Sequence, residues 1–204
     1  MLLNLAVIVI GYLLGSFPSA YIMGRLRKGI DIRNYDMGNM GAGNVIRHVG
    51  IWEGIVVILA DVSKGAGAIL IAQALEVSQP WLLGAGFSAL LGHSFPIFVG
   101  FRGGRGSATL IGIFLVLAPK EIGVTFGIMA IPFVITHNNA FSLFIGFTFL
   151  PLVIWLFGGS MTLVFYSLAV LVFLIARSFP MVKQSIDDVR KNRTIAASHH
   201  SRRD

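Results

Sequence analysis

The chain consists of long hydrophobic runs that are separated by short polar and glycine-rich connections. A helix needs roughly 20 apolar residues to cross about 30 Å of hydrocarbon, and fewer where its ends are buried in protein. The pattern predicts an all-α integral membrane protein with about seven transmembrane helices. These cover approximately Leu2–Met23, Trp52–Leu75, Trp81–Val99, Ser107–Ala118, Glu121–Thr136, Phe141–Phe157 and Met161–Ala176.

Three of these runs leave the pattern open to interpretation. The fourth and fifth are short and meet around Pro119, so they are two spans, two half-helices or one broken pair. The first run, Leu2–Leu14, follows no basic segment and precedes no clear small-residue cleavage site. It is therefore expected to be a retained membrane helix rather than a signal peptide.

The composition excludes an ordinary soluble domain. Of the 204 residues, 55% are hydrophobic and 12% are charged, whereas soluble domains carry about 25% charged residues. The mean hydropathy is +0.81. The chain has no cysteine, so it has no disulfide framework and no thiolate metal site. We expect neither a metal nor a cofactor.

The positions of the basic residues, which give the chain a net charge of +7, indicate its membrane topology. The basic residues lie at the ends of hydrophobic runs rather than along one soluble face, which argues against nucleic-acid binding. The connections around Val77–Pro80, Pro119–Glu121 and Gly158–Ser160 have Lys120 as their only basic residue. The other connections carry Arg25, Arg27, Lys28, Arg33, Arg47, Arg102, Arg105, Arg177, Lys183, Arg190, Lys191 and Arg193.

Basic loops remain preferentially in the cytoplasm, so this asymmetry orients the bundle. The N-terminus is expected outside and the C-terminus in the cytoplasm. Residues 1–182 are expected to form one multi-pass membrane domain, and residues 183–204 a basic cytoplasmic tail that is solvated or lies on the lipid surface.

A polar, glycine-rich stretch between two hydrophobic runs, Gly92–Thr109, is the strongest candidate for chemistry. Gly103, Gly104 and Gly106 can expose backbone N–H groups, and a predicted helix from Ser107 points its N-terminus at the same place. Such a loop suits a phosphate. It matches neither the Walker loop nor a dinucleotide fingerprint. The alternative interpretation is a positively charged turn at the cytoplasmic end of two membrane helices.

Further polar features are predicted on the same side of the membrane. Pro18, in the stretch Gly15–Ser19, is expected to kink the first helix for packing. The segment Asp31–Asn44 is too rich in glycine and asparagine to be a helix, and is either a flexible connector or a cradle for a phosphate. The other polar residues predicted on this side are His93 and the group Thr136–Asn139 with Ser142.

Asp61 and Lys64 are an ionisable pair within the second hydrophobic run. Their three-residue spacing places them on nearly one face of a helix, where they can pair. Ionisable groups at membrane depth are costly to bury, so the pair is a functional candidate. The alternative is an ion pair that only fixes the helix.

These residues resemble the motifs of the bacterial acyl-phosphate:glycerol-3-phosphate acyltransferases. Residues Gly92–Thr109 are similar to the family pattern GHxFPxFxxFxGGKGxAT, with Arg105 in place of its lysine. Asp61, Lys64 and Gly65 match a DxxKG element, and Gly15-Ser16 an early Gly-Ser helix. The loop Asp31–Asn44 partly matches DxRxxGSGNxGATN. The four motifs occur in the family's order over about the first half of the chain.

The resemblance implies a seven-helix enzyme of the bacterial inner membrane with its active site facing the cytoplasm. It would transfer a fatty acyl group from acyl phosphate to the 1-hydroxyl of glycerol 3-phosphate, giving lysophosphatidic acid for phospholipid synthesis without a metal or acyl-CoA. The expected partners are these two substrates and membrane lipids. The sequence leaves acyl-chain preference, the identity of the polyol phosphate and oligomeric state open.

The motifs and the resemblance together assign three groups of residues. The catalytic candidates are His93, Arg105 and Ser142. The candidates for binding substrate phosphates are Arg33, Asn39, Gly41, Asn44, Gly103, Gly104, Arg105, Gly106 and Thr109. Ser16, Asp61 and Lys64 are expected to support the site.

The chain also departs from the family pattern. A methionine, Met37, replaces the serine of GSGN and follows an additional carboxylate, Asp36. Gly43 loses a hydroxyl, and Asn139 and Met181 stand where motifs of the second half are incomplete. These departures support a second hypothesis, a catalytically impaired paralogue that binds lipids or anions at the membrane. A small transporter, suggested by the many glycines and the Asp61–Lys64 pair, is the third.

Overall fold

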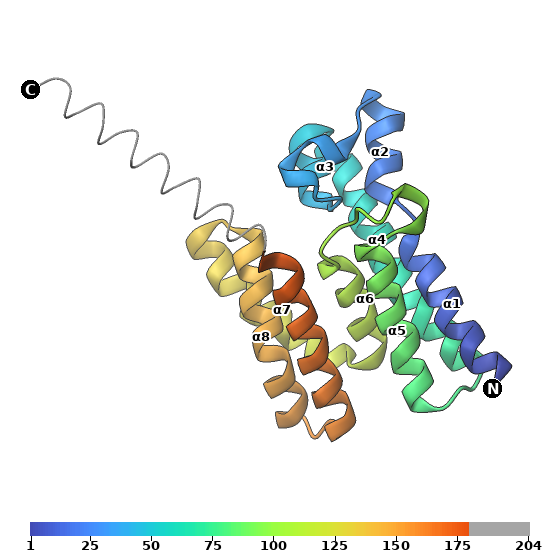
Figure 1. Cartoon of the computed structure of the whole chain (residues 1–204). Coiled ribbons are helices and arrows are strands. Elements are labelled where there is room, and N and C mark those ends of the chain that lie inside the picture. Colours follow the sequence, from blue (N-terminus) through green and yellow to red (C-terminus); the bar gives the residue numbers. More distant parts are fainter. Residues whose placement is uncertain (180–204) are drawn as a thin grey trace, which may run out of the picture.

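The computed structural model describes residues 1–179, which form helices and connecting loops with no strand in that range (Figure 1). The predicted tail 183–204 and Met181 lie outside the described residues. The α-helices are α1 (Leu2–Ser16), α2 (Ser19–Lys28), α3 (Ala42–His48), α4 (Ile51–Ala74), α5 (Gln79–Ser94), α6 (Ser107–Leu117), α7 (Pro119–Thr136), α8 (Asn139–Leu156) and a last helix, Met161–Phe179. Short 3-10 turns are η1 (Ile32–Asn34), η2 (Asp36–Gly38) and η3 (Ile97–Val99).

Within residues 1–179, six helical segments are long and apolar enough to cross a membrane, which accounts for all but one of the predicted spans. The exception is α6, whose 11 residues extend only about 16 Å. In Figure 1, α6 begins beside the loop at 100–106 and ends short of the far end of the bundle. The uncertain pair around Pro119 is therefore one short helix followed by one helix of spanning length.

The predicted first span is correct in position, but it is two helices. Pro18 has no N–H to donate and disfavours helical geometry at the preceding residue. Accordingly, Phe17 leaves the helix with φ −58° and ψ 116°, and α2 begins at Ser19. The sequence predicted only a kink, whereas the helix is interrupted completely between Ser16 and Ser19. The residues at this interruption line one side of the pocket described below.

The end of the segment Asp31–Asn44 is α-helical. The prediction that its glycine and asparagine content prevents a helix is therefore wrong there. Helix α3 starts at Ala42 and contains Gly43 and Asn44. The Asn44 amide donates to the carbonyls of Ile32, Tyr35 and Asn39 at 2.9, 3.1 and 2.9 Å. These tertiary hydrogen bonds fold the loop around α3 and outweigh the cost of one helical glycine, about 1 kcal/mol.

Close helix crossings set the position of the polar end of the bundle. Helix α1 packs along α5, and α4 along α6. At both crossings a glycine faces the partner backbone so closely that a Cβ would collide with a carbonyl oxygen, as small residues allow in membrane bundles. The glycines are Gly15 and Gly92 in the first crossing, and Gly65 and Gly112 in the second.

The orientation of the bundle can be tested by single-cysteine labelling, because the chain has no native cysteine. The α4–α5 connection and the connection from α8 to the last helix lie at one end of the bundle, and α2, α3 and loop 100–106 lie at the other (Figure 1). Cysteines at Ser78 and Ser160 should react with an impermeant reagent from outside, whereas a cysteine at the exposed Asn34 should react only after the cells are opened. External labelling at position 34 would reverse the assignment.

Candidate active site

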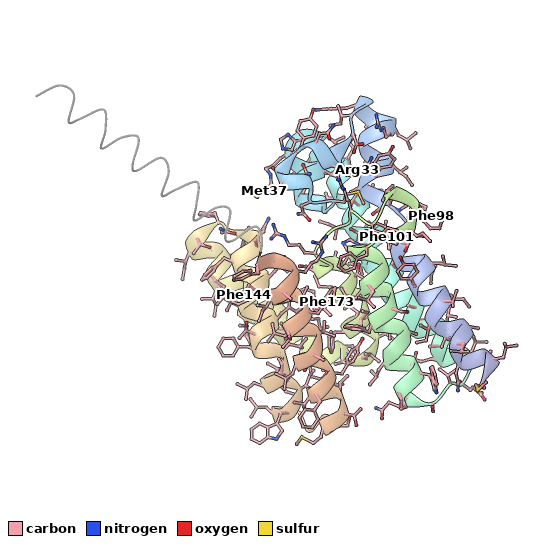
Figure 2. All side chains as sticks on the ribbon, viewed as in Figure 1. Arg33, Met37, Phe98, Phe101, Phe144 and Phe173 are labelled. Carbon is pink, nitrogen blue, oxygen red and sulfur yellow. The ribbon has the colours of Figure 1, made fainter. Side chains whose placement is uncertain are left out.

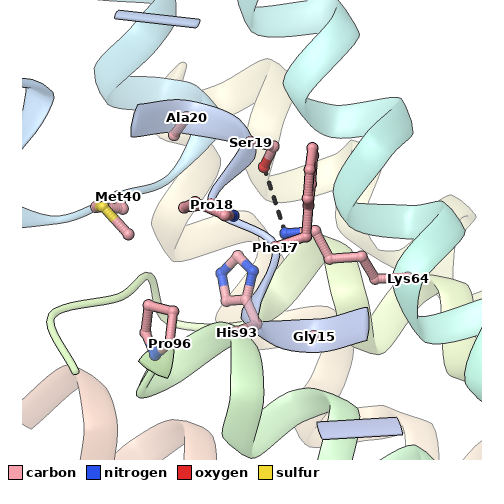
Figure 3. Close-up of a pocket in the computed structure, with 9 residues that line it drawn as sticks. All are labelled: Gly15, Phe17, Pro18, Ser19, Ala20, Met40, Lys64, His93 and Pro96. Atoms are coloured by element: carbon pink, nitrogen blue, oxygen red, sulfur yellow. Dashed lines mark hydrogen bonds between the residues drawn. The ribbon is translucent and has the colours of Figure 1, made fainter. Parts of the chain in front are cut away.

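A pocket lies at the break between α1 and α2, and residues from several sequence motifs line it (Figure 3). It is a small, partly open recess of about 10 Å³, roughly the space of one water molecule, so this conformation admits only a small chemical group. The lining residues are Gly15, Phe17, Pro18, Ser19, Ala20, Met40, Lys64, His93 and Pro96.

A buried ionic cluster forms the floor of this pocket. One carboxylate oxygen of Asp61 accepts hydrogen bonds from Ser19 Oγ at 2.5 Å and from Lys64 Nζ at 2.6 Å. Lys64 also reaches Ser19 Oγ at 3.3 Å, the contact drawn in Figure 3. The Asp61 and Lys64 side chains are 2% and 7% exposed. The expected pairing of Asp61 with Lys64 is present, and Ser19 joins it.

His93 lies between this cluster and the glycine loop. Its Nδ1 is 3.7 Å from the Asp61 carboxylate, and its side chain is 6% exposed. On the other side of the ring, Nε2 faces Gly104 so closely that a Cβ there would collide with it. The predicted catalytic histidine therefore lines the pocket with both ring nitrogens against protein groups, an arrangement suited to positioning the loop.

The glycine loop packs onto the end of α5, which corrects one detail of the phosphate-cradle prediction. The Gly104 N–H donates to the carbonyl of His93 at 3.1 Å, so that donor is not open to an anion. Gly103 is buried against the carbonyls of His93 and Ser94, where a Cβ would not fit. Gly106 has φ +91° and precedes α6, a conformation that favours glycine. In this conformation the loop glycines allow close packing and a positive φ, and the Gly104 N–H is not available to an anion.

Arg105 provides the positive charge of this loop. Partial burial lowers the pKa of its guanidinium, repulsion from Arg47 and Arg177 lowers it further, and attraction to Asp36 opposes the change. The repulsion that Arg47 and Arg177 exert on Arg105 indicates that the three arginines lie in one region. Because cations that repel one another are stabilised by a shared anion, the arrangement favours a phosphate at this place.

Arg177, near the end of the last helix, anchors that helix to the glycine loop. Its Nη2 donates to the carbonyls of Ser94 at 3.2 Å and Gly103 at 3.5 Å. Its guanidinium also lies over the Phe95 ring, 5.1 Å from the centroid. The C-terminal part of the described chain thus reaches the same site as the motifs of the first half.

Arg33 connects two loops in this structure. Its Nε and Nη2 donate to the Asp31 carboxylate at 2.9 and 2.6 Å, and its Nη1 donates to the Val99 carbonyl at 2.9 Å. Hydrogen bonds from Arg33 lower the pKa of Asp31 to about 2, so the carboxylate stays ionised at neutral pH. Figure 2 shows Arg33 in the loop layer near Phe98 and Phe101. The predicted phosphate ligand is here a bridge between η1 and η3.

Comparisons with known proteins identify the family to which this chain belongs. Residues 5–186 match the sequence profile of the family described as glycerol-3-phosphate acyltransferase. The chain belongs to this family. The family resemblance seen in the motifs is therefore confirmed over most of the sequence, and the protein is an acyltransferase by family.

Several glycerol-3-phosphate acyltransferases are similar to it over most of their length. That of Prochlorococcus marinus (strain NATL1A) is 40% identical over 159 residues, covering 78% of this chain and 80% of the relative. That of Parasynechococcus marenigrum (strain WH8102) is 42% identical over 164 residues, covering 80% and 77%. Glycerol-3-phosphate acyltransferase 1 of Dehalococcoides mccartyi is 35% identical over 205 residues, covering 97% and 98%.

Solved structures of the same family confirm the all-α integral membrane fold. The crystal structure of PlsY (YgiH), an integral membrane glycerol 3-phosphate acyltransferase, in its glycerol 3-phosphate form matches with a TM-score of 0.83 and 27% identity. The match covers 91% of this chain and 92% of that one. The lysophosphatidic acid form of PlsY matches with a TM-score of 0.81 and 26% identity.

The remaining predicted site residues of this acyltransferase occupy different places. Ser16 and Thr109 are fully buried near the α1–α5 and α4–α6 crossings, and within the described range their hydroxyls have no hydrogen-bond partner. Asn39 and Gly41 lie in the turn that leads into α3. Ser142 is buried in the first turn of α8, where its hydroxyl donates to the Asn138 carbonyl at 2.9 Å. Ser142 does not line the pocket.

Sequence reasoning did not assign a role to Ser19, Arg47 or Arg177. Ser19 has a detectable signal, since it is a polar residue directly after the proline of an otherwise apolar run. Arg47 was used only as a topology marker, and Arg177 as a topology marker and as the one clearly kept residue of an incomplete C-terminal family motif, because a basic residue at a membrane boundary has the same pattern whether it faces lipid or a site. Only the tertiary fold brings the two near Arg105.

Proposed function

We propose that this chain transfers a fatty acyl group from an acyl phosphate to the 1-hydroxyl of glycerol 3-phosphate and releases lysophosphatidic acid and inorganic phosphate. The observation that carries the proposal is the pocket over the Asp61–Lys64 pair. It brings the early Gly-Ser helix, the DxxKG element and the GHxFP motif of one acyltransferase family into a single site. The arginines around the adjacent loop supply the charge that phosphate-bearing substrates require.

In this reaction the bonds that form and break belong to the two substrates, so the protein itself has little covalent chemistry to perform. The glycerol hydroxyl oxygen attacks the carbonyl carbon of the acyl phosphate, the carbon–oxygen bond to phosphate breaks, and the donor's phosphate takes the hydroxyl proton as it leaves. The protein has to align the hydroxyl with the carbonyl and stabilise the phosphates. Arg105 is the proposed phosphate contact, and His93, Asp61 and Lys64 hold the loop that carries it.

We place this reaction at the cytoplasmic face of a bacterial inner membrane. The pocket, the glycine loop and the basic connections share one end of the bundle (Figure 1). The exposed aromatic side chains Phe17, Phe95, Phe98 and Phe101 lie at the same end. Basic residues favour the cytoplasm, and the exposed phenylalanines offer apolar surface beside the site to the acyl chain of the donor.

The donor class can be tested directly with the purified protein. Given glycerol 3-phosphate and palmitoyl phosphate, it should form lysophosphatidic acid, which mass spectrometry identifies. With palmitoyl-CoA as the donor, no product should form. Equal rates with both donors would contradict the acyl phosphate assignment. The absence of product with either donor would favour the impaired paralogue.

The described departures from the family pattern leave the pocket intact, which supports the active enzyme over the impaired paralogue. Met37 is 53% exposed, Gly43 lies inside α3, and Asn139 begins α8. None of these three lines the pocket. The transporter alternative rested on the many glycines and on the Asp61–Lys64 pair. Asp61 of that pair contacts Ser19 and His93 of neighbouring helices. This arrangement supports a catalytic site rather than an ion path.

A further inference from the structure

Asp36 is bound to a basic side chain of the neighbouring helix. Its Oδ2 accepts hydrogen bonds from Arg47 Nε, at 2.8 Å, and from Arg47 Nη2. Its Oδ1 lies 3.3 Å from His48 Nε2. Both donors on one edge of the guanidinium therefore converge on a single carboxylate oxygen. These are donors that an arginine can also offer to a phosphate.

The pair lies at the surface of the loop layer. The Arg47 side chain is 59% exposed and that of Asp36 is 25% exposed. Burial opposes ionisation of Asp36, but the hydrogen bonds from Arg47 and His48 outweigh it and lower its pKa. An ion pair with such access to water contributes little to stability, so another anion can replace the carboxylate at small cost.

The backbone at this place is unusual for the residues that occupy it. Asp36 has φ 45° and Met37 has φ 57°, in the left-handed region that favours glycine. Met37 projects from the loop layer in Figure 2 and is exposed. A carboxylate is thus held next to Arg47 on a turn that a glycine would form with less strain.

Arg47 is electrostatically coupled to the site. Its repulsion contributes to the lowered pKa of Arg105 in the glycine loop, whereas Asp36 opposes that lowering. Gly43, one turn before Arg47 in α3, has space toward the guanidinium, since a Cβ there would lie 3.7 Å from Nη1. The Asp36 carboxylate therefore partly neutralises the charge that a substrate phosphate would meet.

We infer that Asp36 is an internal anion that occupies the Arg47 guanidinium in the substrate-free protein, and that a substrate phosphate binds by displacing it. This inference rests on the proposed function and adds to it a residue that sets phosphate affinity. Asp36 competes with the phosphate, so the wild-type protein binds phosphate compounds more weakly than its arginines alone would allow. No covalent step involves Asp36.

The test compares phosphate binding by the wild type with that by Asp36→Asn and Asp36→Gly. Both variants remove the competing charge, and glycine also relieves the positive φ, so loss of folding does not confound the result. The dissociation constant of inorganic phosphate, measured by calorimetry on the full chain in detergent, should fall about two- to fivefold in both variants. Glu53→Gln is the matched control, because it removes another carboxylate paired with an arginine, Arg27, at 2.7 Å.

In an Arg47→Gln background, Asp36→Asn should no longer change phosphate affinity. An unchanged dissociation constant in Asp36→Asn and Asp36→Gly, or an equal gain in Glu53→Gln, would overturn the inference. The binding measurement needs no turnover. Tighter phosphate binding in protein that forms no lysophosphatidic acid would therefore refute the proposed reaction while supporting the role of Asp36.

Discussion

Lys64→Met should abolish acyl transfer and sharply reduce the yield of folded protein. The substitution removes the ammonium group 2.6 Å from the Asp61 carboxylate, which is 2% exposed and lies within the span Ile51–Ala74. Breaking a buried pair by removing one partner costs about 3–5 kcal/mol, because an uncompensated charge stays behind. The lost contact also loosens Ser19, which lines the pocket. Thermal unfolding in detergent and acyl-transfer rates measure the two effects.

The double variant Asp61→Asn with Lys64→Met distinguishes a coupled pair from two independent residues. Removing both charges leaves none unpaired, so this protein should recover much of the folded yield lost in Lys64→Met while it remains inactive. Lys120→Met is the control, since Lys120 is an exposed lysine at the start of α7. If the stability losses of the two single changes simply add, Asp61 and Lys64 do not form a unit.

Arg105→Gln should lower kcat/KM for glycerol 3-phosphate by more than about tenfold. A charge-assisted hydrogen bond to a phosphate contributes about 1.5–3 kcal/mol, which corresponds to roughly a 10- to 150-fold change. The partial burial of Arg105 keeps solvent from screening that contact. Arg105→Lys retains the charge and restores the residue of the family pattern, so it should be the mildest change at this position.

Arg102→Gln is the matched control for Arg105→Gln. Arg102 belongs to the same loop and carries the same charge, but it is exposed to solvent. Its removal should change kcat/KM less than about twofold, because exposed charges are screened. Equal losses in Arg102→Gln and Arg105→Gln would mean that the loop acts through its net charge alone, as a basic membrane turn.

Hydropathy was sufficient to locate the membrane helices. Each long apolar run became helical close to its predicted position, the first as the two helices α1 and α2, because a membrane segment must satisfy its own backbone hydrogen bonds wherever the chain crosses lipid. The Asp61–Lys64 contact was equally predictable, since both residues lie on one helix and their spacing fixes their proximity. Helix positions and contacts within one helix can therefore be predicted from the spacing of residues along the sequence.

Features that depend on contacts distant in sequence were not predictable. Helix α3 forms in a glycine-rich segment because Asn44 bonds to carbonyls from the preceding loop. The loop glycines pack on His93, which no property of the loop itself reveals. Likewise, sequence could not distinguish Arg33, whose donors bridge Asp31 and Val99, from Arg47 as a phosphate contact. Which guanidinium faces a site is a property of the tertiary fold.

The most direct measurement is the release of inorganic phosphate by the purified protein given acyl phosphate, with and without glycerol 3-phosphate. The proposed reaction predicts that release requires the acceptor and that each phosphate is matched by one molecule of lysophosphatidic acid. Phosphate release that proceeds equally without glycerol 3-phosphate would indicate a hydrolase. No release in folded, membrane-inserted protein would contradict the acyltransferase assignment for this chain.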